Sequence, residues 1–111
     1  MLNTAKRFET PIHNERTSNY AKVTVVTYRS FLDGGFNTYY RVEDGRDEPR
    51  EYHLDECELD LVKADKLHDE HCRDIHSALD RVNLDKVEEL WDLIQELRRA
   101  LYEIRRERGK V

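Results

Sequence analysis

The sequence has few of the residues that build disulfide scaffolds, and it has no membrane-spanning run. Its 111 residues include two cysteines, two prolines and four glycines. Cys57 and Cys72 are too few for a disulfide scaffold, and we expect both to be free thiols. No apolar run approaches the roughly 18 residues of a membrane span, and the N-terminus lacks the apolar core of a signal peptide. We therefore expect a cytoplasmic protein without a membrane segment.

Signatures of catalysis are also missing from the sequence. It contains no P-loop, no Gly-x-Gly-x-x-Gly turn and no His-Glu-x-x-His motif. Cys72, His76 and Asp80 have the residue types of a thiol triad at helical spacing. One polar helix face without a nearby glycine, however, offers neither donors for an oxyanion nor a substrate pocket. We predict a protein without enzymatic activity and without a cofactor.

The histidines and cysteines repeat one spacing, in His53 with Cys57 and in Cys72 with His76. On a helix, His68, Cys72 and His76 form a stripe that can offer two ligands to zinc. On a strand, positions 53 and 57 lie about 13 Å apart at roughly 3.3 Å per residue, which is too far to share one ion. We therefore predict no metal site, with these side chains solvated or at the edge of the core.

The length allows one domain with a modest core. Residues 1–19 have no hydrophobic periodicity and predict an arm or loop. Residues 20–32 and 36–43 are rich in β-branched and aromatic residues, and the Asp-Gly-Gly turn between them predicts a hairpin. A third strand is expected at about residues 51–61, after a second Asp-Gly turn. Its apolar positions change parity, which predicts a bulge near residues 55–56 or an early exit from the sheet.

Two helices are expected after the sheet. Residues 62–82 place their apolar side chains on one face at helical spacing, with His71 filling a gap. Residues 84–108 predict a longer helix with Asn83 as its N-cap and Gly109 as its stop. The predicted fold is α+β, with a three-stranded antiparallel sheet over residues 20–61 and two antiparallel helices over residues 62–108. Together they form a single domain over residues 20–111.

The predicted C-terminal helix carries a short heptad pattern of apolar residues. Fewer than three heptads are present, so the pattern fits two arrangements. The helix packs within its own chain as half of a helical hairpin, or it also pairs with a second copy in a homodimer. The residues predicted for this packing are Val87, Leu90, Trp91, Ile94, Leu97, Leu101 and Ile104.

Charge is distributed unevenly along the chain. Residues 1–42 carry six basic and three acidic side chains, residues 43–96 carry seven and nineteen, and residues 97–111 carry six and two. The net charges of these segments are therefore +3, −12 and +4. A field of one sign over half of a small domain attracts oppositely charged partners, so the acidic middle predicts a binding function.

Seven acidic residues of the middle segment form two rows at regular spacing. Alternate positions of a strand lie roughly 6.6 Å apart on one face, and every third or fourth position of a helix returns to the same side. These intervals are broadly similar to the spacing of phosphates along nucleic acids, so the rows predict a docking surface for a basic protein. The predicted contact residues are Glu56, Glu58, Asp60, Asp65, Asp69, Glu70 and Asp74.

The predicted partner is a nuclease or another protein that binds nucleic acid, because an acidic surface can occupy its basic groove and displace the nucleic acid. Binding of this kind would inhibit the partner. In size and composition the chain is similar to small acidic inhibitors encoded by phages and mobile elements, some of which mimic DNA. This likeness rests on no shared motif. A solvated acidic face that only keeps the protein soluble is the alternative interpretation.

Two further functions stay open at this point. A dimeric structural or assembly protein would use the second helix as its interface. Direct binding of nucleic acid would use the basic N-terminal segment, the strand aromatics as a stacking surface and the arginines near the C-terminus. The acidic middle opposes this last function because it repels phosphates. The C-terminal arginines are Arg98, Arg99, Arg105, Arg106 and Arg108.

Overall fold

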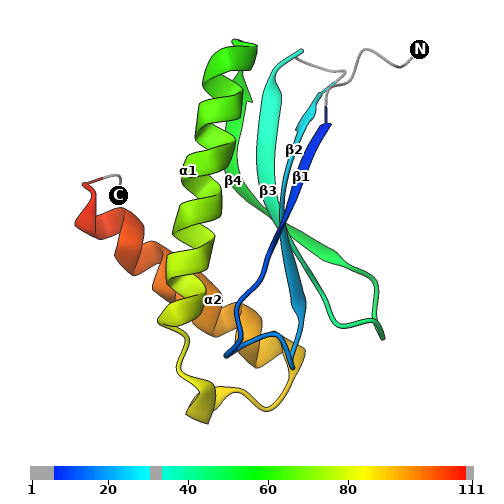
Figure 1. Cartoon of the computed structure of the whole chain (residues 1–111), viewed down its shortest axis with the longest axis vertical. Coiled ribbons are helices and arrows are strands. Elements are labelled where there is room, and N and C mark those ends of the chain that lie inside the picture. Colours follow the sequence, from blue (N-terminus) through cyan, green and yellow to red (C-terminus); the bar gives the residue numbers. More distant parts are fainter. Residues whose placement is uncertain (1–6, 31–33, 110–111) are drawn as a thin grey trace.

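The computed structural model describes residues 7–30 and 34–109, without the side chains of residues 7 and 55–57. It has two layers, a four-stranded antiparallel sheet and two helices that cover one face of the sheet (Figure 1). The strands β1 (Arg7–Ile12), β2 (Lys22–Arg29), β3 (Phe36–Glu43) and β4 (Arg50–Glu58) lie side by side in chain order. The predicted α+β class is confirmed, whereas the predicted number of three strands is wrong.

The additional strand comes from the segment predicted to be an arm. β1 pairs antiparallel with β2, from Arg7 opposite Tyr28 to Ile12 opposite Val23. The strand is short and contains Pro11, which is why its sequence does not have the periodicity of a strand. Proline is tolerated here because β1 is an edge strand, where one side makes no ladder hydrogen bonds.

The connection from β1 to β2 is fastened to the C-terminal end of helix α1 (Leu61–Asp80). Arg16 donates hydrogen bonds to the backbone carbonyls of Leu79 at 3.2 Å and Val82 at 2.8 Å, and also to that of Asp80. Asn14 donates from its side-chain amide to the Asp80 carboxylate at 2.8 Å. A cation at this end of a helix satisfies carbonyls that have no partner within the helix. Residues 7–19 are therefore an integral part of the domain rather than an arm.

The two predicted turns join β2 to β3 and β3 to β4. Gly34 in the first turn has a φ of 70°, although residues 31–33 lie outside the described part. In the second turn, Gly45 has a φ of 79°, and the Asp44 carboxylate accepts hydrogen bonds from two backbone N–H groups at 2.9 and 3.1 Å. A positive φ favours glycine, and aspartate stabilises such turns through its side chain.

The predicted irregularity in the last strand is also present. Thr38 of β3 lies opposite Asp55, and the next residue, Tyr39, lies opposite His53. Leu54 is therefore an extra residue in β4, and its side chain is buried against the helices. A second register shift lies between the Phe36 and Thr38 pairs. The bulges let β4 keep apolar residues of both parities in the fold.

Helix α1 begins one residue earlier than predicted and ends two residues earlier. Asp60 is its N-cap, and the carboxylate accepts hydrogen bonds from the N–H groups of Val62 at 2.8 Å and Lys63 at 3.3 Å. His71 is buried on the inner face of the helix, as predicted.

The second helix begins later than predicted. Asn83 caps a separate 3₁₀ helix, η1 (Leu84–Lys86), by accepting a hydrogen bond from the next-but-one N–H group at 3.1 Å. Helix α2 spans Leu90–Glu107 and has its own start, because the Asp92 carboxylate accepts the N–H groups of residues 88 and 89, both at 3.1 Å. The helix ends before Gly109, whose φ is 72°, as predicted.

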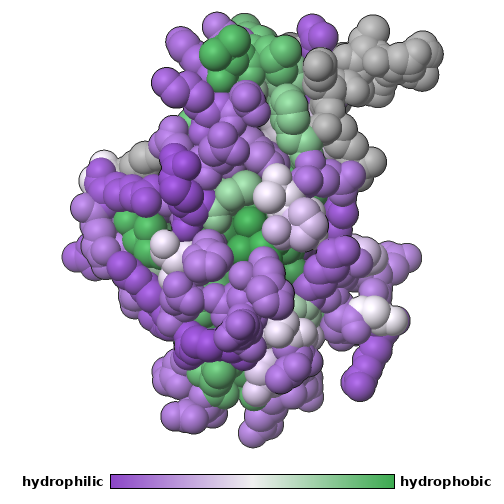
Figure 2. Space-filling view, viewed as in Figure 1, coloured by the Kyte–Doolittle hydropathy of each residue, from purple (hydrophilic) through white to green (hydrophobic). Residues whose placement is uncertain are grey.

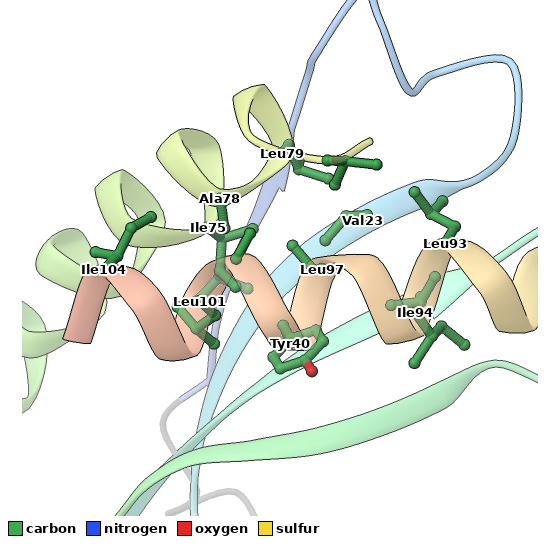
Figure 3. Close-up of a cluster of buried hydrophobic side chains, with 14 of the residues drawn as sticks. Val23, Tyr40, Ile75, Ala78, Leu79, Leu93, Ile94, Leu97, Leu101 and Ile104 are labelled. Carbon is green, nitrogen blue, oxygen red and sulfur yellow. The ribbon is translucent and has the colours of Figure 1, made fainter. Parts of the chain in front are cut away.

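The core lies where the two helices meet each other and the sheet (Figure 3). Leu97 and Leu101 of α2 pack with Ile75 of α1 and with Val23 and Tyr40 of the sheet. In Figure 1 the helices cross obliquely, whereas a hairpin of antiparallel helices would lie alongside over its whole length. No helix among the described residues is long and apolar enough to cross a membrane.

Candidate protein-binding surface

The predicted acidic residues lie around the junction between β4 and α1. Glu58 ends β4 and is half-buried, whereas Asp65 and Asp69 are exposed on the outer side of α1. Asp60 is exposed as well, although its carboxylate is engaged in capping α1. Glu70 is half-buried on the same helix, and the side chain of Glu56 lies outside the described part of the chain.

Asp74 does not belong to this surface, which corrects the prediction. Its side chain is only 1% exposed, and it forms an ion pair with Arg108 at the C-terminal end of α2. Asp74 does lie on α1 at helical spacing from the other acids, but at this position the C-terminal end of α2 packs against α1 and covers its side chain. A carboxylate buried in this way joins the two helices through its ion pair and is not accessible on the surface.

Apolar side chains stand exposed among these acids. Leu59 and Val62 are each 70% exposed, and Leu61 is 40% exposed. Figure 2 shows hydrophobic surface at the upper end of the molecule, over the start of α1, with hydrophilic residues around it. We call this region the junction surface; its members are Glu58, Leu59, Asp60, Leu61, Val62, Asp65 and Asp69.

The apolar part of the junction surface is absent from the sequence-based prediction. Leu59 and Leu61 fit the strand pattern, so the sequence assigns them to a face of the sheet. The structure instead ends β4 at Glu58 and begins α1 at Leu61. The capping preference of Asp60 is the signal that marks this boundary in the sequence, since it turns the residues around it out of the strand.

Basic residues interrupt the acidic row on α1. Lys63, Lys66 and Arg73 are all exposed on the same helix as Asp65 and Asp69. The charges therefore alternate in sign along much of this face. Such alternation departs from the uninterrupted negative charge of a nucleic-acid backbone, and it fits a partner that also carries both signs.

The residues predicted for helix packing mostly lie inside the single chain. Val87, Ile94, Leu97, Leu101 and Ile104 are all buried in its core. Leu90 is half-buried, whereas Trp91 is 49% exposed and does not take part in the packing of the heptad stripe. The apolar stripe is therefore already covered by α1 and the sheet, and a homodimer through the same stripe would have to open the fold.

The strand aromatics are divided between the two faces of the sheet. Tyr28, Tyr39 and His53 form a row on the face opposite the helices, with ring centroids 5.2 and 4.7 Å apart. Arg41 on this face is held between Glu9 at 3.0 Å and Glu51 at 3.1 Å. The rings stack on one another and the arginine is already paired with two carboxylates, so this face offers little to a nucleic-acid strand.

Most of the C-terminal arginines are engaged within the fold. Arg98 lies over the Tyr52 ring, Arg99 pairs with Glu96 at 3.0 Å, and Arg105 donates a hydrogen bond to the Leu54 carbonyl at 2.6 Å. Arg108 pairs with Asp74, as described above. These contacts explain much of the positive charge at this end as a structural feature.

The histidine and cysteine stripe of α1 faces three different environments. His68 is buried, and its ring nitrogens are hydrogen-bonded to the hydroxyls of Thr10 at 2.8 Å and Thr27 at 2.9 Å. Burial raises the pKa of the Cys72 thiol, which keeps it protonated and weakly nucleophilic at neutral pH. His76 is exposed, with Nδ1 3.8 Å from the Asp80 carboxylate. Among the described residues, no three His, Cys, Asp or Glu side chains gather to hold a metal ion.

No family model, no curated protein and no solved structure matches this chain.

Proposed function

We propose that this protein binds a basic partner protein through the junction surface. The observation that carries the proposal is the exposure of Leu59 and Val62, each at 70%, next to exposed or half-buried acidic side chains. Acidic side chains alone are explained by solubility. Large apolar side chains exposed together are unfavourable in water, and such a patch marks a surface that a partner covers. Because these apolar side chains lie near Glu58, Asp65 and Asp69, the partner surface that covers them should be positively charged.

The two kinds of side chain have different tasks in such a complex. The apolar residues at the centre supply affinity, because burying them removes apolar area from water. The acids at the rim steer the approach of a positively charged surface and reject negative ones, an effect that salt weakens. The basic residues Lys63 and Lys66 next to them set the register against acids of the partner.

Proteins that process nucleic acids are the narrower class of partner that we propose. They carry the large basic surfaces that complement Glu58, Asp65 and Asp69, and occupation of such a surface displaces nucleic acid from it. The consequence of binding would then be inhibition of the partner. The interruption of the acidic row by Lys66 and Arg73 favours recognition of the protein surface around the groove over a close imitation of DNA.

Capture of partners from the source cell with a set of matched baits tests the proposal. We expect the wild-type protein to retain a basic protein at low salt and to release it at high salt. The variant L59S/V62S removes the apolar centre, and E58K/D65K/D69K reverses the acidic rim; each should lose that protein. The variant E15K/E48K/D85K has the same change in net charge at exposed positions outside the junction surface, and it should retain the partner.

Equal loss from the two charge-reversed baits would contradict the proposal, because net charge rather than the junction surface would then be responsible. Full retention by L59S/V62S would show that the exposed leucine and valine have no part in binding. Thermal unfolding of each bait, measured in parallel, shows that the substitutions leave the fold intact.

A further inference from the structure

A groove lies at the end of the molecule opposite the junction surface. It has a volume of about 580 Å³ and is formed by three segments, residues 19–20, the connection from β3 to β4, and the first turn of α2. These segments come together at the lower end of the view in Figure 1, far from the start of α1. The volume lies in the range of sites that hold small ligands or a few residues of a peptide.

Two aromatic rings stand exposed in this groove. Trp91 is 49% exposed and Tyr20 is 37% exposed, and both contribute to the lining together with Leu90 and Ile94. Ile94 is fully buried and anchors the wall in the core. The groove therefore combines exposed aromatic ring surface with a mostly charged lining, and Trp91 is the only tryptophan of the chain.

A guanidinium group already lies over the tryptophan. The central carbon of the Arg50 guanidinium is 5.8 Å from the centroid of the Trp91 ring. This distance is within the range of cation–π attraction, for which tryptophan is the best aromatic partner. The contact with Arg50 indicates that the Trp91 ring can accept a guanidinium group.

The charge around the groove favours cations. Asp44, Asp47, Glu88 and Glu89 line it, against the two arginines Arg46 and Arg50. Two backbone N–H groups that donate to Asp44 hold the pKa of that carboxyl below its usual value, so its charge persists at mildly acidic pH. Four carboxylates against two guanidinium groups leave the groove with a net negative charge.

We propose that this groove binds an arginine-bearing peptide segment of a partner protein, with an incoming guanidinium taking the Trp91 ring in competition with Arg50. The carboxylates of Asp47 and Glu88 accept the remaining cationic groups of the segment. Arginine is favoured over lysine because its planar guanidinium stacks on an aromatic face as well as pairing with carboxylates. This site is separate from the junction surface and does not depend on it.

The single tryptophan makes the groove directly observable. Titration of the protein at low salt with acetylated, amidated hexa-arginine should change the Trp91 fluorescence until the site is saturated. Hexa-lysine should bind more weakly, and hexa-glutamate and free arginine should leave the fluorescence unchanged at the same concentration. Calorimetry on the same samples gives the affinity independently of the optical signal.

Three variants locate the binding. D47N/E88Q removes two charges from the groove and should weaken hexa-arginine binding by about 5- to 20-fold, given the usual strength of exposed ion pairs. R50A frees the ring and makes the groove more negative, so it should strengthen binding several-fold. D65N/D69N changes the same number of charges at the junction surface and should leave the affinity for the groove unchanged.

An affinity that falls in R50A would overturn the proposed competition for the ring. Equal weakening by D47N/E88Q and D65N/D69N would show general attraction between charges rather than a site. Absence of a saturable fluorescence change would remove the site altogether. None of these outcomes bears on partner capture through Leu59 and Val62, so the two proposals fail separately.

Discussion

The Asp74 carboxylate, 1% exposed on α1, is paired with the guanidinium of Arg108 at the end of α2. This pair joins two residues 34 positions apart and ties the C-terminal end of α2 to the middle of α1. A buried carboxylate is costly unless a cation and hydrogen bonds compensate for the lost water. Arg108 therefore has a structural task, although the sequence places it in a basic cluster at the end of the chain.

Removal of Arg108 should destabilise the protein more than removal of the charge on Asp74. R108A leaves a buried carboxylate without its cation, and we expect a loss of about 1–3 kcal/mol in the free energy of unfolding. D74N leaves only an arginine at the surface and should cost less. Urea unfolding of both variants and of R108A/D74N measures this, and the double variant should be more stable than R108A. A double variant less stable than R108A would contradict the pairing.

The secondary structure follows from local patterns in the sequence wherever one pattern is strong. The β-branched residues of β2, the apolar stripe of α1 and the glycine after α2 predict those elements within a few residues. The start of α2 is different, because Asn83 and Asp92, nine positions apart, can each accept backbone N–H groups at the start of a helix. The structure uses both, the first for η1 and the second for α2.

Strand β1 depends on contacts that a local pattern does not contain. The strand pairs with β2. The connection after it is held by hydrogen bonds from Arg16 to the end of α1, which join residues more than 60 positions apart. Long-range packing, which one sequence does not specify by inspection, therefore accounts for the missed strand. The missed apolar centre of the junction surface instead follows from the end of β4, which the capping residue Asp60 marks locally.

Arg16 should stabilise the fold through the end of α1. R16A removes its hydrogen bonds to the carbonyls of Leu79, Asp80 and Val82, and we expect a loss of about 1–2 kcal/mol in the free energy of unfolding. Hydrogen exchange should become faster at the last turn of α1. R106A, which removes an exposed arginine of α2, is the matched control and should change stability by less than about 0.5 kcal/mol. Equal stabilities of R16A and the wild type would mean that these bonds contribute nothing.

His68 should make the fold sensitive to acid. Burial lowers its pKa in the folded state, against the weaker opposing effect of the Asp69 and Asp65 carboxylates. As the pH falls, the His68 side chain is therefore protonated in the unfolded chain before it is protonated in the folded protein. The contribution of His68 to the free energy of unfolding is complete above the unfolded pKa of about 6.5 and decreases as the pH drops below it. One such group contributes a slope of at most about 1.4 kcal/mol per pH unit.

Chemical unfolding between pH 7.5 and 5.5 measures this dependence. H68Q should have a flatter profile over that range, whereas H13Q, which removes an exposed histidine, should keep the wild-type slope. The same slope in H68Q and the wild type would assign the acid sensitivity to other groups.

Tyr28 should ionise late because of its surroundings on the open face of the sheet. Burial, followed by the negative charge of Glu51, raises its pKa to about 12. E51Q removes the second cause and should lower the pKa of Tyr28, while the pKa of Tyr40, raised to about 12 chiefly by burial, should stay in place. Absorbance at 295 nm against pH, with Y28F to assign the signal, follows both groups. An unchanged Tyr28 titration in E51Q would show that Glu51 does not contribute to the raised pKa and would leave burial and the neighbouring Tyr39 as its causes.

The raised phenol pKa values also predict a loss of stability at high pH. The unfolded phenols lose their protons from about pH 10, before the folded ones, so the free energy of unfolding should fall as the pH rises above 10. Y28F should reduce this fall. A profile that is flat from pH 9.5 to 11.5 would contradict the two assignments.

Hydrogen exchange of the captured complex tests the central claim most directly. Amides of residues 58–66 should become protected when the basic partner binds. Amides of residues 44–50, at the opposite end of the molecule, should become protected only if the partner also carries an arginine-bearing segment that enters the groove. Protection should be centred on Leu59 and Val62, and it should be lost in L59S/V62S. A bound partner that leaves residues 58–66 exchanging as in the free protein would contradict the account.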